Sequence, residues 1–131
     1  MLFVCVENAC RSLMAEAFFN HAAPPGWRAV SAGTRPTRSA EPRTARLLAE
    51  VGIAAPEHPP QILTPEMLSA AEIVVTMGCL DDEACPARLR HLRPRDWGLP
   101  DPARLDDDGF RSVRDTIRER VGALRRELSS G

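Results

Sequence analysis

The first 23 residues combine a short apolar run, a polar loop and an amphipathic stretch, and this order constrains the whole fold. Met1 to Val4 is apolar throughout and predicts a short buried strand. Ser12 to Ala23 carries apolar residues at helical spacing and predicts a helix. The loop from Cys5 to Ser12 therefore ends at a helix N-terminus, where unpaired backbone N–H groups and the helix dipole attract anions. The sequence predicts an anion-binding loop.

The side chains of this loop suit a nucleophile that attacks a bound oxyanion. Cys5, lying under the ring of N–H groups, would be held as a thiolate, which is the nucleophilic form. Arg11 offers a planar fork for two anion oxygens. Ser12 can donate its hydroxyl to the thiolate or cap the helix, and Asn8 tolerates a left-handed backbone. The alternative, a structural Cys5 beside a solvated Arg11, is disfavoured because a strand precedes the motif and a helix follows it.

The rest of the chain alternates between strand-like and helix-like segments. This alternation predicts a single α/β domain over residues 1–131, with a parallel sheet of about four strands and helices on both faces. A chain of this length can bury a real core. The expected elements are strands over Trp27–Ala32 and Glu72–Met77, a short strand near Leu92, and helices over Glu41–Val51, Pro65–Ala70 and Asp107–Leu128.

Charge and cysteine content exclude several classes of partner. The chain has 17 basic residues, all of them arginine, and 18 acidic residues, so neither nucleic acid nor an anionic membrane surface is an expected partner. No apolar run approaches the ~18 residues of a membrane span, and the start carries no export signal. Four cysteines without such a signal predict reduced thiols in the cytoplasm that are used for chemistry.

A second pair of cysteines, Cys79 and Cys85, follows the strand expected over Glu72–Met77. The ends of parallel strands share one edge, where ligands bind, so this segment is expected within reach of Cys5. The polar residues between the two cysteines predict an exposed segment that can carry a sulfur toward Cys5. Two alternatives stay open: incidental cysteines, or partial metal ligands together with His91, although this spacing is not a standard zinc pattern.

The motif Cys5-x5-Arg11-Ser12 directly after the first strand resembles that of the low-molecular-weight protein tyrosine phosphatases. It also resembles that of the thioredoxin-coupled arsenate reductases, which share their fold. The resemblance covers nearly all of the chain in the family's order, and the opening motif and Asp101-Pro102 are specific together. It implies a low-molecular-weight phosphatase-like domain. The weaker matches are Val30–Thr34, Glu41-Pro42, Ile73–Met77 and Trp97–Pro102.

This resemblance implies a thiol relay that reduces arsenate to arsenite in arsenic detoxification. Cys5 would attack arsenate while Arg11 binds its oxygens, and Cys79 would then attack Cys5 and release reduced arsenic. Cys85 would attack Cys79 and move the disulfide outward, where thioredoxin or a similar dithiol protein would reduce it. Pro86 matches the family's proline after the second cysteine, whereas the two cysteines are one residue closer than is usual. No cofactor is implied.

The resemblance also implies roles for supporting residues. Asp101 would protonate the leaving oxygen, and Ser31 would brace the loop. Glu16 resembles part of a cation site of some reductases, but Gln61 stands where an aspartate would complete it, so no metal ion is predicted. Cys10 is expected to pack behind the loop rather than to form a disulfide with Cys5. The three histidines receive no role, and the remaining expected loop residues are Glu7, Asn8, Ala9 and Ser12.

The main alternative is a low-molecular-weight phosphatase that acts on phosphotyrosine or aryl phosphates through a Cys5-phosphate intermediate. Such phosphatases usually carry a tyrosine after the Asp-Pro pair, but here Ala103 follows and the chain contains no tyrosine. The loss of this stacking surface argues against a phosphotyrosine slot. A third class, an oxyanion-binding sensor, would need neither Asp101 nor the second cysteine pair and ranks last.

Overall fold

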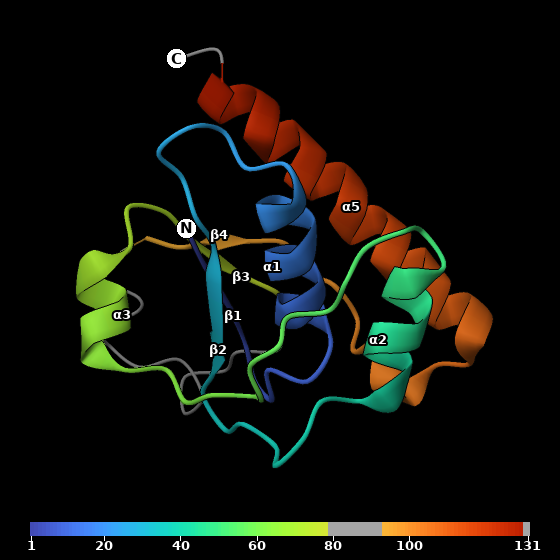
Figure 1. Ribbon diagram of the computed structural model, residues 1–131. Helices are drawn as coiled ribbons and strands as arrows, with labels where there is room; N and C mark the ends of the chain where they lie inside the picture. Colours follow the sequence, from blue (N-terminus) through green and yellow to red (C-terminus); the bar gives the residue numbers. More distant parts are fainter. Residues whose placement is uncertain (79–92, 130–131) are drawn as a thin grey trace.

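The computed structural model describes residues 1–78 and 93–129, which form a parallel sheet with helices on either side (Figure 1). The α/β fold predicted from the sequence is confirmed. The elements in chain order are β1 (Leu2–Cys5), α1 (Arg11–His21), β2 (Val30–Gly33), α2 (Pro42–Ala49), α3 (Pro65–Ala70), β3 (Val74–Thr76), β4 (Arg95–Asp96), the 3-10 helix η1 (Pro102–Arg104) and α5 (Asp107–Ser129).

The predicted strands differ from the observed ones in their bounds: Met1–Val4 is shifted to Leu2–Cys5, and Glu72–Met77 is shortened to Val74–Thr76. The strand expected from Trp27 begins only at Val30, because the side-chain amide of Asn20 bonds both backbone groups of Ala29. These contacts, at 2.8 and 2.9 Å, take the place of the strand ladder. The strand expected near Leu92 lies partly outside the described residues, and β4 begins at Arg95.

The sheet has the strand order β2-β1-β3-β4, and all neighbouring strands are parallel. In this register Cys5 lies beside Gly33 of β2, and Val4 lies beside Thr76 of β3. The carboxyl ends of the three strands therefore meet at one edge. Since ligands bind at this edge of an open parallel sheet, the topology places Cys5 where a binding site is expected.

The alternating side chains of β1 pack into two separate hydrophobic cores, one on each face of the sheet. Phe3 faces the layer of α1, α2 and α5, and its ring packs 6.2 Å from Phe19 and 5.7 Å from Trp97. Leu2 and Val4 face the opposite side, where α3 covers the sheet (Figure 1). With both faces covered, β1 is buried along its whole length, as its unbroken apolar run predicts.

Hydrogen bonds from three arginines tie α2 to the elements around it. Arg111 and Arg114 of α5 bond Glu50 at the end of α2, and the hydrogen bonds from Arg111 and Arg114 lower the pKa of Glu50 to about 2. Arg43 donates to the backbone carbonyls of Ala103 and Leu105, at 3.2 and 2.8 Å. The start of α2 and the segment η1 are thereby fixed against each other, which matters because each flanks the predicted loop.

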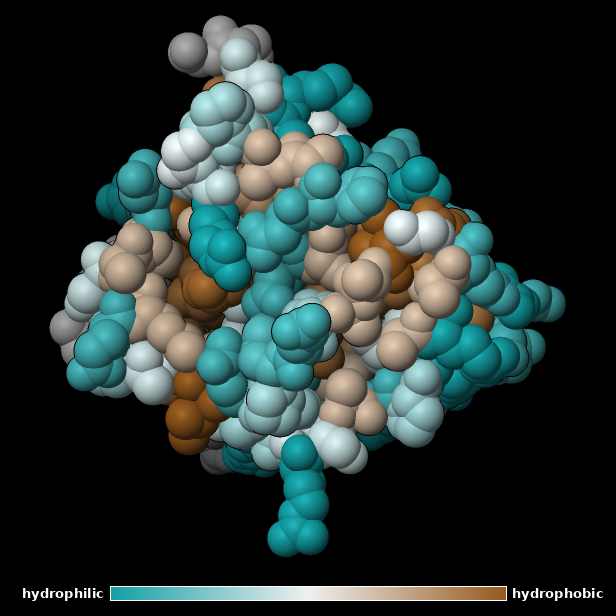
Figure 2. Space-filling view, viewed as in Figure 1, coloured by the Kyte–Doolittle hydropathy of each residue, from teal (hydrophilic) through white to brown (hydrophobic). Residues whose placement is uncertain are grey.

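The surface shown in Figure 2 is mainly hydrophilic, with hydrophobic residues emerging in small separate areas rather than one broad one. Among the described residues, no helix combines the length and apolar character that a membrane crossing needs.

Gly33 leaves no room for a side chain beside the predicted loop. A Cβ atom built there would lie 2.6 Å from the carbonyl oxygen of Val6 and 2.9 Å from the amide nitrogen of Asn8. Because both neighbours are backbone atoms of the loop, a larger residue at this position has to displace the loop itself.

We therefore predict that Gly33→Ala slows the alkylation of Cys5 at least tenfold and destabilises the fold by about 1–3 kcal/mol. Mass mapping of iodoacetamide-treated protein and urea denaturation measure the two effects. Gly122→Ala in α5 is the control, since its added Cβ meets only the Arg126 side chain at 3.5 Å. A Gly33→Ala protein with wild-type alkylation would contradict the prediction.

Candidate active site

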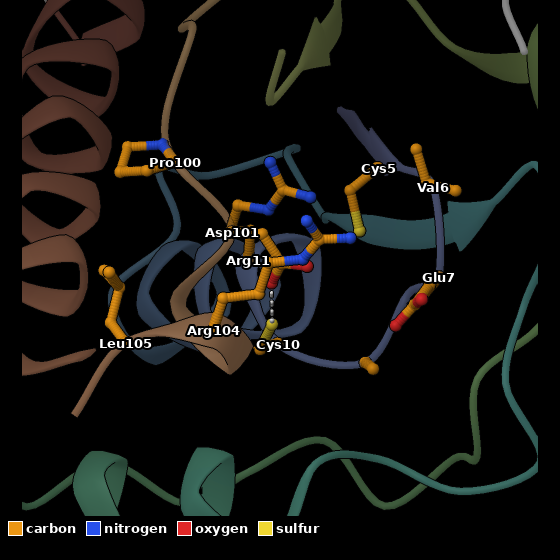
Figure 3. A pocket seen from close by; sticks show the side chains of 10 residues that line it. Cys5, Val6, Glu7, Cys10, Arg11, Pro100, Asp101, Arg104 and Leu105 are labelled. Carbon is orange, nitrogen blue, oxygen red and sulfur yellow. Dashed lines mark hydrogen bonds between the residues drawn. The ribbon is translucent and has the colours of Figure 1, made fainter. Parts of the chain in front are cut away.

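The loop from Cys5 to Ser12 forms the floor of a cavity of about 450 Å³ at the carboxyl edge of the sheet (Figure 3). Asn8 adopts a positive φ of 51°, which turns the chain sharply before α1. The cavity brings together residues from the loop and from the segment around η1. Its lining consists of Cys5, Val6, Glu7, Ala9, Cys10, Arg11, Pro100, Asp101, Arg104 and Leu105.

The backbone of the loop has a fixed orientation because segments outside the loop bind its carbonyl groups. Three backbone amides that follow β2, those of Thr34, Arg35 and Thr37, donate in turn to the carbonyls of Cys5, Val6 and Glu7. The amide of Glu41, at the start of α2, donates to the carbonyl of Ala9. In a trans peptide the following N–H points the opposite way. Bonding the carbonyls outward therefore turns the loop N–H groups inward, as an anion cradle requires.

The sulfur of Cys5 is buried and receives two short contacts. The backbone N–H of Asn8 donates to it at 3.2 Å, and the hydroxyl of Ser12 lies 2.9 Å away. Cys5 is 2 % exposed, so these groups replace the water that would otherwise solvate a thiolate.

The side chain of Asn8 decides which way the surrounding protons point. Its carbonyl oxygen accepts from the backbone N–H of Gln61 at 3.0 Å, and a backbone N–H can only donate. The amide nitrogen therefore faces the two serines, Ser12 at 2.7 Å and Ser31 at 3.0 Å. Because Ser12 accepts from Asn8, its own proton remains available to donate to the sulfur of Cys5.

The same chain of hydrogen bonds continues away from Cys5 to a buried carboxylate. Ser31 donates to Glu16 at 3.0 Å, and His58 lies 2.9 Å from both carboxylate oxygens of Glu16. The other ring nitrogen of His58 lies 2.8 Å from the carbonyl of Pro59. Both ring nitrogens thus face acceptors, so the geometry fits a doubly protonated imidazolium. Burial acts to lower the pKa of His58, but the bonds to Pro59 and Glu16 outweigh it and the pKa is raised.

The sequence indicated no role for His58, whose contact with Glu16 appears only in the structure. His58 stands beside Glu16, which resembles part of a cation site, and in its protonated form it supplies a positive charge next to that carboxylate. Gln61 does not act on Glu16; its backbone binds Asn8 and its side chain donates to the carbonyl of Ser31 at 2.8 Å. The sequence signal that could have indicated this contact is Glu16 itself, because a glutamate buried on a helix needs a partner for its charge.

Arg11 joins the loop to two other segments. Its side chain is buried, and Nη1 donates to the carbonyls of Leu99 at 2.9 Å and Met77 at 3.3 Å. The first carbonyl lies two residues before Asp101 and the second directly follows β3. One guanidinium therefore fixes the loop, the end of β3 and the approach to Asp101 relative to one another, while it also lines the cavity.

Asp101 reaches the same cavity and contacts Cys10. The Cys10 thiol lies 3.7 Å from Oδ1 of Asp101 (Figure 3), and the backbone N–H of Ala103 donates to the same oxygen at 3.0 Å. Burial raises the pKa of Cys10 to about 12, with smaller contributions from Cys5 and Asp101. Cys10 therefore stays a neutral thiol that packs in the core, and its contact and that of the Ala103 amide both use Oδ1 of Asp101.

The remaining predicted residues divide into two groups. Glu7 is exposed and lines the cavity, whereas Ala9 is buried and its carbonyl accepts from Thr44 at 2.9 Å. Cys79 and Cys85 lie outside the described residues, so the relay segment stays a sequence prediction.

These features define a cysteine-based oxyanion site on a parallel α/β sheet, and comparison with known sequences gives its family. The family described as low molecular weight phosphotyrosine protein phosphatase matches residues 1–131. Arsenate reductase 1 of Staphylococcus epidermidis is 36% identical over 120 residues, 91% of this chain and 89% of that protein. The chain belongs to the low molecular weight phosphotyrosine protein phosphatase family.

Solved structures include both reductases and phosphatases. A thioredoxin-dependent arsenate reductase from Corynebacterium glutamicum matches with a TM-score of 0.77 and 30% identity, over 97% of this chain and 60% of that one. An arginine phosphatase from Geobacillus stearothermophilus matches with a TM-score of 0.85 and 25% identity, over 98% and 92%. The resemblance drawn from the sequence motifs is confirmed at the level of the family and fold.

We predict that Ser12→Ala slows the alkylation of Cys5 about tenfold at neutral pH, because the sulfur loses its 2.9 Å hydroxyl donor. Iodoacetamide labelling followed by peptide mass mapping measures the Cys5 site separately from the other cysteines. Ser69→Ala, an exposed change on α3, is the matched control and should leave the rate unchanged. Equal rates for Ser12→Ala and wild type would contradict the direction of protons argued above.

A second prediction concerns the ion pair between His58 and Glu16. Because the pKa of His58 is raised in the folded protein, the stabilisation is complete below the unfolded value of about 6.5 and disappears as pH rises through the folded value. We expect wild type to exceed His58→Gln in free energy of unfolding at pH 6, with the difference shrinking toward pH 9. Urea denaturation across this range measures it.

Glu16→Gln provides the test that the carboxylate is the cause. In that background the pH-dependent difference between His58 and His58→Gln should shrink markedly, since the charged partner is gone. A pH trend of equal size in both backgrounds would mean that another group raises the pKa of His58.

Proposed function

We propose that this chain reduces arsenate to arsenite with Cys5 as nucleophile and Cys79 and Cys85 as the redox pair. The observation that carries the proposal is the environment of Cys5, whose sulfur lies 3.2 Å from the Asn8 amide and 2.9 Å from the Ser12 hydroxyl. The relatives named as arsenate reductases support the same reaction. The proposal also takes residues 1–131 as one domain that works in the cytoplasm.

In the first step, the Cys5 thiolate attacks the arsenic of a bound arsenate and forms a sulfur–arsenic bond. One arsenic–oxygen bond breaks, and Asp101 supplies the proton with which that oxygen leaves as water. Arg11 and the loop N–H groups hold the other oxygens and stabilise their negative charge in the transition state.

In the second step, the Cys79 thiolate attacks the sulfur of Cys5 and a disulfide forms between them. The sulfur–arsenic bond breaks, and its electron pair stays on arsenic, which leaves as arsenite in the +3 state. Cys85 then attacks Cys79, which frees the Cys5 thiolate and moves the disulfide to Cys79–Cys85. Thioredoxin or a similar dithiol protein is the proposed donor that returns both cysteines to thiols.

A phosphatase is the second candidate, because the family and the arginine phosphatase share the fold and the same loop chemistry acts on phosphate esters. In that reaction Cys5 would carry a phosphoryl group, and water would release it with no change of oxidation state. The absence of any tyrosine from the chain argues against a stacking slot for phosphotyrosine.

Incubating the reduced protein with arsenate, without added reductant, separates these candidates. We expect mass mapping to find one Cys79–Cys85 disulfide formed for each arsenite released. Unchanged thiols together with rapid hydrolysis of an aryl phosphate would favour the phosphatase instead.

The roles of the cysteines are tested by two variants. Cys5→Ser should abolish both arsenate reduction and aryl phosphate hydrolysis, because both need the nucleophile. Cys79→Ser should abolish arsenate turnover and spare phosphate ester cleavage, because only the redox step needs it. Equal loss of both activities in Cys79→Ser would contradict this assignment.

A further inference from the structure

A second arginine, Arg104, lines the same cavity as Cys5 and Arg11. It is the last residue of η1, the short helix that begins directly after Asp101. Figure 3 shows its side chain extending from η1 across the cavity in the direction of Cys5, with its guanidinium on the same side as that of Arg11. The pocket therefore has two guanidinium groups facing the place where an oxyanion would sit.

The backbone that carries Arg104 is firmly held. Asp101 caps η1 by accepting from the amide of Ala103 at 3.0 Å. Arg43 of α2 donates hydrogen bonds to the carbonyls of the two residues that flank Arg104, Ala103 at 3.2 Å and Leu105 at 2.8 Å. The backbone of Arg104 is thus anchored to the elements that position Asp101 and the loop, and its exposed side chain extends from this fixed point into the cavity.

Arg104 also differs from arginines whose charge is satisfied within the protein. Arg111 and Arg114 bind Glu50, and Arg95 binds Glu127. Among residues 1–78 and 93–129, no carboxylate forms a salt bridge with Arg104. A cation that faces an anion site without a carboxylate partner is available to the ligand, and its fork geometry matches a tetrahedral oxyanion.

The charges around the cavity indicate that Arg104 compensates the negative charge of a bound oxyanion. Two acidic residues, Glu7 and Asp101, line the same cavity as the two arginines. Arg11 directs Nη1 to the carbonyls of Leu99 and Met77, so part of its fork is occupied by the protein. A doubly charged inorganic oxyanion entering past Glu7 and Asp101 needs a second compensating cation, and Arg104 supplies one at the open side.

We propose that Arg104 is a substrate-binding residue that selects small inorganic oxyanions over esters with a bulky organic group. Its guanidinium binds the oxygens that face the cavity mouth, where the alcohol portion of an ester would have to leave the site. This inference rests on the proposed function, because it assumes that the cavity binds a tetrahedral oxyanion.

The test uses inorganic phosphate as the probe, since phosphate has the shape and charge of arsenate and does not oxidise the thiols. Isothermal titration of the reduced protein should show that Arg104→Ala weakens phosphate binding about tenfold or more. Arg104→Lys should recover part of the affinity because it keeps the charge without the fork. Arg118→Ala, an exposed change in α5 far along the chain, is the control and should bind like wild type.

Selectivity is measured with the same variants. An aryl phosphonate, which cannot be hydrolysed, stands in for the ester, and its affinity is measured by competition with phosphate. In Arg104→Ala this affinity should fall less than the affinity for phosphate does. Equal weakening of both ligands, or phosphate binding within twofold of wild type, would overturn the inference about Arg104. If wild type itself binds no phosphate, the proposed oxyanion site fails, and with it the inference, so the two failures are distinguishable.

Discussion

The hydrogen bond from the backbone N–H of Gln61 to the side chain of Asn8 fixes the polarity of the whole site. It forces the amide nitrogen of Asn8 toward Ser12 and Ser31, so each serine accepts there and donates its own proton elsewhere. The hydroxyl of Ser12 then lies 2.9 Å from the sulfur of Cys5, and Ser31 donates to Glu16. A single orienting contact therefore organises the polar groups around the Cys5 sulfur at one end and a paired carboxylate at the other.

The two cores explain how so short a loop is held so firmly. β1 is buried on both faces, and its end, Cys5, lies beside Gly33 in the neighbouring strand. Only a glycine fits there, because a Cβ atom would lie 2.6 Å from the carbonyl oxygen of Val6, well inside van der Waals contact. Packing on both sides of the sheet fixes the end of β1, and the hydrogen bonds from outside segments to the loop carbonyls fix the orientation of the loop backbone.

The sequence predicted the order of elements and the nature of the loop well, for reasons that are local. Pro65–Ala70 was predicted to the residue because Thr64 caps this helix and Pro65 opens it. The second strand was predicted too long, because the side chain of Asn20 on α1 captures the backbone of Ala29. No local pattern reports a contact between residues nine positions apart, so only the folded chain reveals it.

By itself, the sequence determined the parallel α/β class, the family, and the pairing of a cysteine with an arginine at a helix N-terminus, because these depend on periodicity and short spacing. Tertiary structure decided what surrounds them. His58 contacts Glu16 across 42 positions of sequence, and Arg104 extends from η1 into the cavity that Cys5 lines. Such partners are chosen by how the layers pack, which brings distant charges together without leaving any regular spacing in the chain.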